Sequence, residues 1–269
     1  KIPQMFEAAI DKELKGLWII GEDIVQTDPN SAHVVEAMNS LELLVVQEIF
    51  MSETAKLATV VLPGTTFLEK DGTFTNTERR IQRVNRAVPP LPGTKPDGVI
   101  VTDMMQKLGF DQPTYDADQV LNEIADVVPF FKGVTRERLG KLGLQWPVQE
   151  DGTDTQILHT ESFKLGKGRL KNFDWKESSE IEANQKEYPL ILTTSRVLQH
   201  YNAATMTRRT KNINIVDEDV LLIHPKDAAY RDLNTGDIGR LYSGRGEVAL
   251  KVEVTDKVKE GIVFTTFHF

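Results

Sequence analysis

Three short apolar runs occur within the first 62 residues, and a polar turn follows each of them. The runs cover residues 17–20, 43–46 and 59–62. Residues 31–41 carry apolar side chains at helical spacing, and Ser52 is a suitable N-cap for a short helix over 53–58. This alternation of strands and helices predicts a parallel, doubly wound sheet.

The turns after these runs are candidate binding residues, because such sheets bind ligands beyond the carboxyl ends of their strands. They contain Gly21, Glu22 and Asp23, then Gln47 and Glu48, then Gly64, Thr65 and Thr66. Backbone N–H groups at a strand-to-helix turn can face phosphate, and carboxylates can accept hydrogen bonds from ribose or guanine. The residues alone also fit ordinary turns with acids near helix starts. The glycine fingerprint of NAD-binding proteins is missing.

Further helices are predicted at 97–108 and 118–127, and a shorter one at 135–142. Asp97 is expected to cap the first of these, which does not exclude contact with a ligand. The polar segment 149–187 is expected to be a connection with one or two short strands.

The last third of the chain is richer in strands and contains one short helix, predicted at 225–233. Strands are predicted at 188–194, 219–223, 238–243, 246–254 and 261–267. The first of these is apolar and is expected to be buried. The pattern predicts a small β-barrel, so we expect two domains, over residues 1–148 and 149–269.

A cluster of cations follows the strand predicted at 188–194, although the net charge of the 269-residue chain is −8. It contains Arg196, His200, Arg208 and Arg209. The arginine fork suits pyrophosphate or carboxylate, and a histidine can donate to a phosphate or ribose oxygen. Further donors are Thr194, Ser195, Asn202 and Thr205. The cluster favours a local anion site over a purely structural role.

The polar loop over residues 69–80 allows two interpretations, a functional loop or a solvated loop with weak Arg–Glu pairs. The overall acidity argues against nucleic-acid binding, and no apolar run is long enough for a membrane span. The chain has no cysteine, which excludes disulfides and thiolate ligands within it.

Four segments, taken in order, resemble the carboxy-terminal part of formate dehydrogenase catalytic (alpha) subunits. These subunits belong to the molybdopterin oxidoreductase (dimethylsulfoxide reductase-like) family. The segments are "ELKGLWIIGEDIVQTDPN", "LELLVVQEIFMSETAKLATVVLPGTTFLEKDGTFTNTERRIQ", "LTTSRVLQHYNAATMTRR" and "GDIGRLYSGRGEVALKVEVTDKVKEGIVFTTFHF". The resemblance covers nearly the whole chain and is weakest from about 111 to 187.

The resemblance implies a partial α/β molybdopterin-dinucleotide-binding domain over 1–148 and a double-psi β-barrel over 149–269, possibly incomplete at its end. It implies a cofactor of molybdenum or tungsten held by two molybdopterin guanine dinucleotides, and the interconversion of formate and carbon dioxide. The cofactor-binding residues that it implies are Gly21, Glu22, Asp23, Gln47, Glu48, Thr66, Asp97, Thr194, Ser195, Arg196, His200, Asn202 and Thr205. Of these residues, Asp97 is expected to contact the guanine base.

The metal ligand of the family, a selenocysteine or cysteine, has no counterpart in this chain, and neither does its iron–sulfur motif. We therefore expect a part of a longer subunit that is not catalytic alone, with no catalytic or metal-binding residue of its own. Expected partners are the rest of the catalytic subunit, iron–sulfur or electron-transfer subunits, and formate or carbon dioxide as substrate. No nucleic acid and no direct membrane span are expected, and the location is expected to be cytoplasmic.

Three alternatives to a formate dehydrogenase stay open from the sequence. One is the same region of a nitrate reductase or of a respiratory NADH dehydrogenase large subunit. Another is a non-catalytic assembly module that has lost the cofactor. A simple NAD-binding protein is the least supported.

Overall fold

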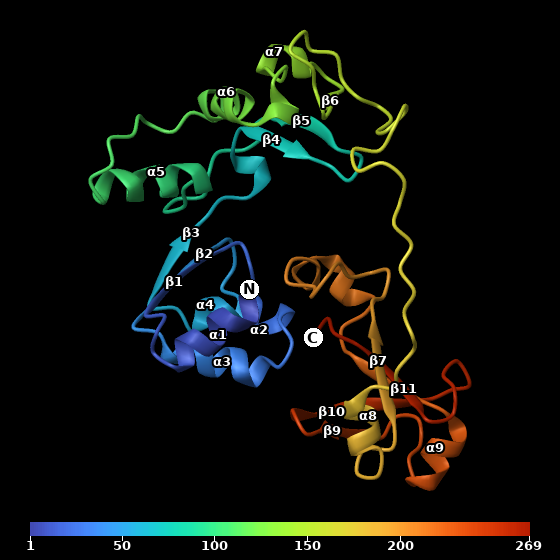
Figure 1. Ribbon diagram of the computed structural model, residues 1–269. Helices are drawn as coiled ribbons and strands as arrows, with labels where there is room; N and C mark the ends of the chain where they lie inside the picture. The colour runs from blue at the N-terminus through green and yellow to red at the C-terminus, as the bar shows by residue number, and fades with distance from the viewer.

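The computed structural model describes residues 1–269, and its N-terminal unit is built on a three-stranded parallel sheet (Figure 1). Strands β1 (Gly16–Ile20), β2 (Leu43–Glu48) and β3 (Val60–Pro63) pair in that order. The helices of this unit are α1 (Ile2–Ile10), α2 (Ile24–Thr27), α3 (Ser31–Ser40) and α4 (Glu53–Lys56). The parallel alternation of strands and helices predicted for this part is confirmed.

One face of this sheet carries the core of the unit. Ile19, Leu44 and Val46 alternate with less buried residues along β1 and β2, and they pack with Val34 and Met38 of α3. Successive strand residues point to opposite faces, so this alternation covers one face with the helices. The strands are thereby held in register, and their carboxyl ends lie together.

A second unit follows, with a small antiparallel sheet of β4 (Gly72–Thr75), β5 (Arg80–Val84) and β6 (Leu144–Gln145). Its helices are η1 (Phe67–Glu69), α5 (Asp97–Lys107), α6 (Ala117–Val127), η2 (Pro129–Phe131) and α7 (Arg136–Leu139). The helices predicted at 97–108 and 118–127 are confirmed. The one predicted at 135–142 is shorter, because Gly140 ends it with a positive φ of 51°. The sheet itself was not predicted.

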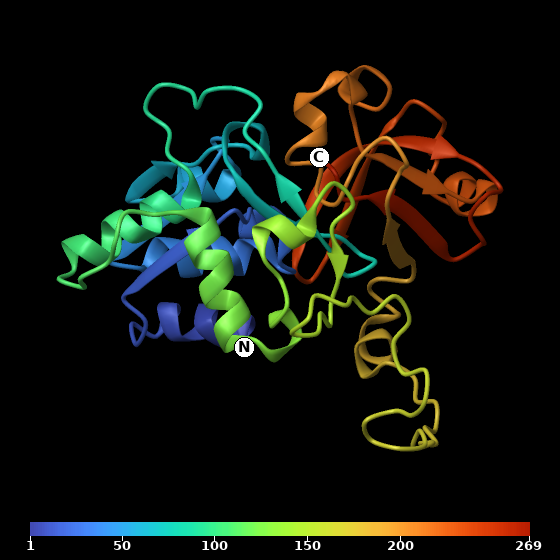
Figure 2. The same cartoon turned by 90° about the horizontal axis from the view of Figure 1, so that it is seen from above.

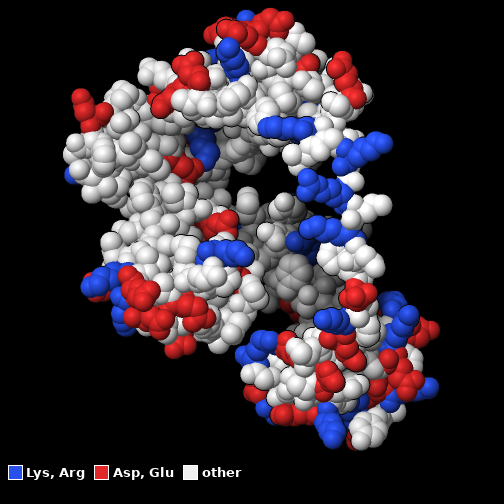
Figure 3. Space-filling view, viewed as in Figure 1, with Lys and Arg blue, Asp and Glu red and all other residues white.

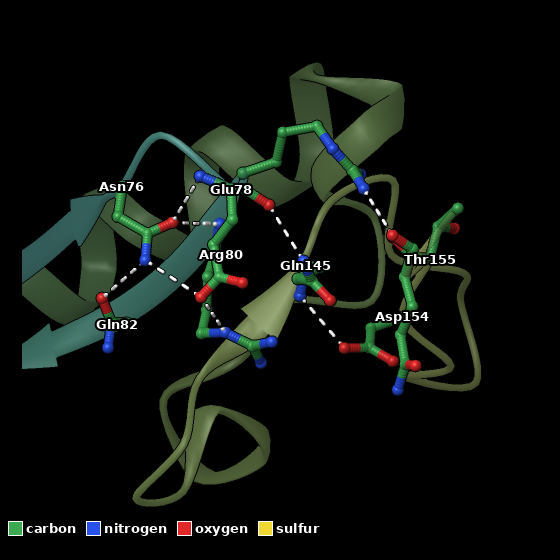
Figure 4. A network of polar contacts seen from close by, with 9 residues as sticks. Asn76, Glu78, Arg80, Gln82, Gln145, Asp154 and Thr155 are labelled. Carbon is green, nitrogen blue, oxygen red and sulfur yellow. Dashed lines mark hydrogen bonds and ion pairs between the residues drawn. The ribbon is translucent and has the colours of Figure 1, made fainter. Parts of the chain in front are cut away.

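The polar loop over residues 69–80 is largely folded into this unit (Figure 4). Asn76 Oδ1 accepts hydrogen bonds from the backbone N–H groups of Glu78 and Arg80, both at 3.0 Å. Gln145 Nε2 donates to the backbone oxygen of Glu78 at 3.0 Å, which ties the β4–β5 turn to β6. These contacts give the distal part of the loop a structural role.

The third unit is a mixed five-stranded sheet with the order β7-β11-β8-β10-β9. Its strands are β7 (Ile191–Ser195), β8 (Val220–Ile223), β9 (Ile238–Ser243), β10 (Gly246–Val254) and β11 (Ile262–Thr266). Its helices are α8 (Ser179–Asn184), η3 (Thr207–Arg209), η4 (Lys211–Asn214) and α9 (Pro225–Tyr230). Leu221, Ile223, Val252 and Val263 form its core. The sheet is a curled half-barrel, which confirms the predicted fold class.

Two predictions for this part of the chain were wrong. β7 is exposed along its whole length and not buried, because it is an edge strand that pairs only with β11. Residues 149–187 contain no strand and instead hold an extended segment followed by α8. The mixed polar composition of that segment leaves it too few apolar residues to join a sheet. The predicted division after residue 148 stays a prediction.

Seen from above, the N-terminal sheet and the half-barrel lie on opposite sides of the molecule, with the C-terminus between them (Figure 2). The segment that carries η3 and η4 reaches from the half-barrel toward the N-terminal sheet (Figure 1). None of the helices is long and apolar enough to cross a membrane.

Candidate functional site

A cleft of about 460 Å³ lies at the carboxyl ends of β1, β2 and β3, where the molecule is hollowed between its units (Figure 3). The residues 201–203, 205 and 206 line its other side. Nine of the thirteen predicted cofactor-binding residues line this cleft: Gly21, Glu22, Asp23, Gln47, Glu48, Thr66, Asp97, Asn202 and Thr205. The structure therefore brings the strand-end turns together with part of the cation-rich stretch, which covers residues 193–210.

Three side-chain oxygens in the lining are buried and have no hydrogen-bond partner: Asp23 Oδ2, Gln47 Oε1 and Thr65 Oγ1. The three residues are only 4%, 1% and 2% exposed. Each follows or ends a different strand of the parallel sheet. Buried polar atoms in folded proteins are nearly always paired, so three unpaired oxygens in residues around one cleft make this cleft the candidate ligand site.

Asp23 is fixed by its other carboxylate oxygen. Asp23 Oδ1 accepts from the backbone N–H of Thr54 at 2.9 Å and from the Thr54 hydroxyl at 2.8 Å. The Thr54 hydroxyl oxygen in turn accepts from the backbone N–H of Val25 at 3.1 Å. This network holds the carboxylate in place and leaves Oδ2 as an acceptor.

Asp97 begins α5 but is not its N-cap, which corrects one prediction. The N-cap is Pro96, and the Asp97 carboxylate instead accepts from Gln47 Nε2 at 2.8 Å and from Lys70 Nζ. Partial burial alone would raise the pKa of Asp97, but the hydrogen bonds from Lys70 and Gln47 outweigh it and lower the pKa. Because Gln47 donates to Asp97, its amide oxygen is the atom left unpaired.

Thr66 lines the cleft, but its hydroxyl is already hydrogen-bonded within the protein. Its hydroxyl and its backbone N–H both donate to Glu69 Oε2 at 2.8 Å, as part of a capping box that starts η1. These hydrogen bonds, with one from the backbone N–H of Leu91, lower the pKa of Glu69. Thr65 has the free hydroxyl; it belongs to the turn expected at the ligand-binding edge but is not among the thirteen residues that the resemblance implies.

Four predicted residues do not line the cleft: Thr194, Ser195, Arg196 and His200. His200 is 5% exposed, and its two ring nitrogens lie 3.0 Å from Thr207 Oγ1 and 2.8 Å from the backbone oxygen of Val216. Arg196 is exposed, lies over the ring of Phe267, and its Nη2 is 3.4 Å from Asn202 Oδ1. Arg196 thus reaches a cleft residue without lining the cleft.

Two other cations of this stretch connect the units on either side of the cleft. Arg208 Nη2 donates to Gln26 Oε1 at 2.6 Å, and the Arg209 guanidinium lies 4.7 Å from the ring centroid of Phe50. Gln26 belongs to α2, and Phe50 follows β2. The cation-rich stretch therefore helps to hold the cleft together.

Ten lining residues are not among the thirteen predicted cofactor-binding residues, although Thr65 lies in a turn expected at this edge and two others lie in the loop over residues 69–80. The ten are Thr27, Ile49, Phe50, Thr65, Phe67, Lys70, Phe74, Tyr201, Ala203 and Met206. Phe67 and Phe74 form a tilted pair with ring centroids 6.2 Å apart. Thr65 could have been found from its place directly after Gly64 at the end of β3. The pair of Phe67 and Phe74 could not have been found from the sequence, because it depends on how the β4–β5 hairpin packs against the residues before it.

Comparison with protein families finds two matches in order along the chain. Residues 1–107 match the family described as molybdopterin oxidoreductase, and residues 190–269 match the molydopterin dinucleotide binding domain. The cleft lies between these two segments and includes residues of both.

Among curated relatives, an F420-dependent formate dehydrogenase subunit alpha of Methanocaldococcus jannaschii is 42% identical over 272 residues. The match covers 100% of this chain and 40% of the relative. A putative formate dehydrogenase of Staphylococcus aureus is 40% identical, over 95% of this chain and 26% of the relative. The chain thus spans two fifths or less of the length of these relatives.

A solved structure, that of the acetylene hydratase from Pelobacter acetylenicus, superimposes with a TM-score of 0.72 at 20% identity. The superposition covers 97% of this chain and 38% of that one, and it shows a shared fold. The two ordered family matches and the relatives together show that the chain belongs to the molybdopterin oxidoreductase family.

Proposed function

We propose that the chain is the cofactor-binding carboxy-terminal region of a molybdenum or tungsten formate dehydrogenase. It holds the guanine dinucleotide and pterin parts of the cofactor. The observation that carries this proposal is the convergence of three unpaired, buried oxygens on one cleft between the two family-matched segments.

The chemistry of the lining fits a molybdopterin guanine dinucleotide. The free carboxylate oxygen of Asp23 and the amide oxygen of Gln47 accept hydrogen bonds only, so they suit a ligand rich in O–H and N–H donors. Ribose hydroxyls and the N–H edge of guanine are such donors. Asp97 accepts on the same side, and carboxylate oxygens have room for more than one donor each.

The work of this chain is to bind and orient the cofactor. When bound, the cofactor supplies the two-electron oxidation of formate or its reverse. The chain contributes the acceptors at the strand ends, and Arg208 and Arg209 fix the opposite wall of the cleft. Arg196 and His200 would support that wall through Asn202 and Thr207.

Formate as the substrate is supported by the names of the relatives, several of which are F420-dependent formate dehydrogenase alpha subunits at 41–42% identity. The proposal includes two dinucleotides per metal and a selenocysteine or cysteine metal ligand supplied from outside this chain. It also includes an iron–sulfur cluster, electron-transfer partner subunits and a cytoplasmic location.

The proposal is tested on the native species that contains this chain, purified from its source without oxygen. We expect about one molybdenum or tungsten and two guanine dinucleotides per chain, measured by elemental analysis and by release of the nucleotide after hydrolysis. The preparation should reduce an artificial acceptor with formate and not with NADH. A preparation without metal or pterin, while a control molybdoenzyme retains both, would instead indicate a non-catalytic assembly module.

A further inference from the structure

Thr65 lies at the end of β3 with a hydroxyl that nothing in the protein uses. The residue is 2% exposed, its Oγ1 has no hydrogen-bond partner, and it lines the cleft. Its neighbour Thr66 lines the same cleft, but its hydroxyl donates to Glu69. A buried hydroxyl that stays unpaired destabilises the folded chain, so its position calls for an explanation.

The backbone around Thr65 is held firmly. The N–H of Gly64 donates to the oxygen of Glu48 at 3.0 Å, and the N–H of Lys95 donates to the oxygen of Pro63 at 3.1 Å. A Cβ on Gly64 would lie only 3.1 Å from Asp97 Oδ1, so the strand end approaches the Asp97 carboxylate closely. Thr65 thus follows a residue, Gly64, whose backbone is hydrogen-bonded to β2 and lies close to Asp97.

An unpaired hydroxyl alone does not make a binding site, and the chain offers the comparison. Thr265 of β11 is 6% exposed and also has an unpaired Oγ1, but it does not line the cleft. Thr65 differs because it lines the cleft together with Asp23 and Gln47, which also carry an unpaired buried oxygen each. The position of Thr65 within this set favours a ligand over a packing defect.

We propose that Thr65 is a specificity-determining residue whose hydroxyl, together with Gln47 Oε1, recognises the N–H-bearing edge of a guanine base. This inference rests on the proposed function of the cleft. Gln47 is locked with its oxygen unpaired because its Nε2 donates to Asp97. Guanine presents neighbouring N–H donors on that edge, whereas adenine presents a ring acceptor there, which an amide oxygen repels.

The test uses the full chain and guanosine diphosphate as a probe, with adenosine diphosphate as the competing purine. Thr65→Val keeps the shape of the side chain and removes its hydroxyl, and Thr265→Val is the matched control. Affinities are measured by calorimetry, and the stability of the ligand-free chain by thermal unfolding. Both variants should unfold at a higher temperature than the wild type, because each loses an unpaired buried hydroxyl.

We expect the wild type to bind guanosine diphosphate more tightly than adenosine diphosphate. Thr65→Val should weaken guanosine diphosphate binding about fivefold, as expected for one lost neutral hydrogen bond, and leave adenosine diphosphate binding unchanged. Thr265→Val should leave both affinities unchanged.

Equal guanosine diphosphate affinities of Thr65→Val and the wild type would overturn the role of Thr65 and leave the proposed function intact. An equal loss for both nucleotides would show that the hydroxyl does not recognise the base. A wild-type chain that binds neither nucleotide would contradict the proposed function, and this inference with it.

Discussion

The strand-end edge of the parallel sheet and the cation-rich stretch over residues 193–210 both carry many polar side chains, but their partners differ. At the strand ends, Asp23, Gln47 and Thr65 keep buried oxygens without a partner. In the cation-rich stretch, His200 and Arg208 have their polar groups paired within the chain. A dense polar pattern therefore marks a binding site only where the fold leaves atoms unpaired.

The two regions consequently have different roles around the same cleft. The strand ends offer acceptors to a ligand, and the cation-rich stretch stabilises the wall opposite them. Substitutions in the first region should change ligand affinity more than stability. Substitutions of the internally paired residues of the second region, His200 and Arg208, should do the reverse. The predictions below test this difference, beginning with the largest expected effect.

His200→Ala should lower the free energy of unfolding by about 2–4 kcal/mol, because it leaves the Val216 carbonyl without its partner, removes one of the two partners of the Thr207 hydroxyl and opens a cavity. Urea unfolding measures this loss. His200→Gln keeps polar atoms near both partners and should lose less. A stable His200→Ala that fails to bind guanosine diphosphate would reverse the roles given to the two regions.

Asp23→Asn should weaken guanosine diphosphate binding by about tenfold or more, because a charge-assisted hydrogen bond is lost. Two donors of Thr54 require an oxygen at Oδ1, so the new amide nitrogen takes the position of Oδ2 and presents donors to a ligand that also donates. Calorimetry measures the affinity. Asp11→Asn, at an exposed site at the end of α1, is the control and should bind like the wild type.

Arg208 and Arg196 have different contacts, which Arg208→Ala and Arg196→Ala test separately. Arg208 connects the two sides of the cleft through Gln26, whereas Arg196 contacts the cleft residue Asn202. Arg208→Ala removes the hydrogen bond to Gln26 and should cost about 1 kcal/mol of stability. The exposed Arg196→Ala should change stability by less than about 0.5 kcal/mol and still reduce retention of the dinucleotide. Urea unfolding and nucleotide release after gel filtration give the two quantities. Unchanged retention in Arg196→Ala would remove Arg196 from the site.

The pair of Lys70 and Asp97 should contribute less than about 1 kcal/mol, since both side chains are partly exposed. The pKa of Asp97 is lowered on folding, so this contribution is present above its ordinary value near 3.8 and is lost as the pH falls through the lower folded value. Lys70→Met should therefore be less stable than the wild type at pH 7 and equally stable in strong acid. A difference that persists in strong acid would point to lost packing instead of lost charge.

The sequence predicted the strands and the edge where a ligand would bind, because apolar periodicity and polar turns are local features. Gly21, Gln47 and Thr66 lie at that edge and line the cleft, and their contact with a cofactor stays a prediction. The exposure of β7 was missed because an apolar edge strand and an apolar central strand share the same local pattern.

The pairing of individual side chains could not be predicted, because it depends on contacts distant in the sequence. Asp97 was expected to cap a helix, but it binds Gln47, which lies 50 residues away. Thr65 and Thr66 are adjacent and chemically identical, and only the capping box with Glu69 tells their hydroxyls apart. Local propensity contains no information on such tertiary choices.

The most direct test of the central claim is an experimental structure of the native, cofactor-loaded species that contains this chain. We predict that O–H or N–H donors of the guanine dinucleotide lie within hydrogen-bond distance of Asp23 Oδ2 and Gln47 Oε1, about 2.7–3.2 Å. A loaded structure in which these oxygens remain unpaired, with the dinucleotide bound elsewhere, would contradict the account.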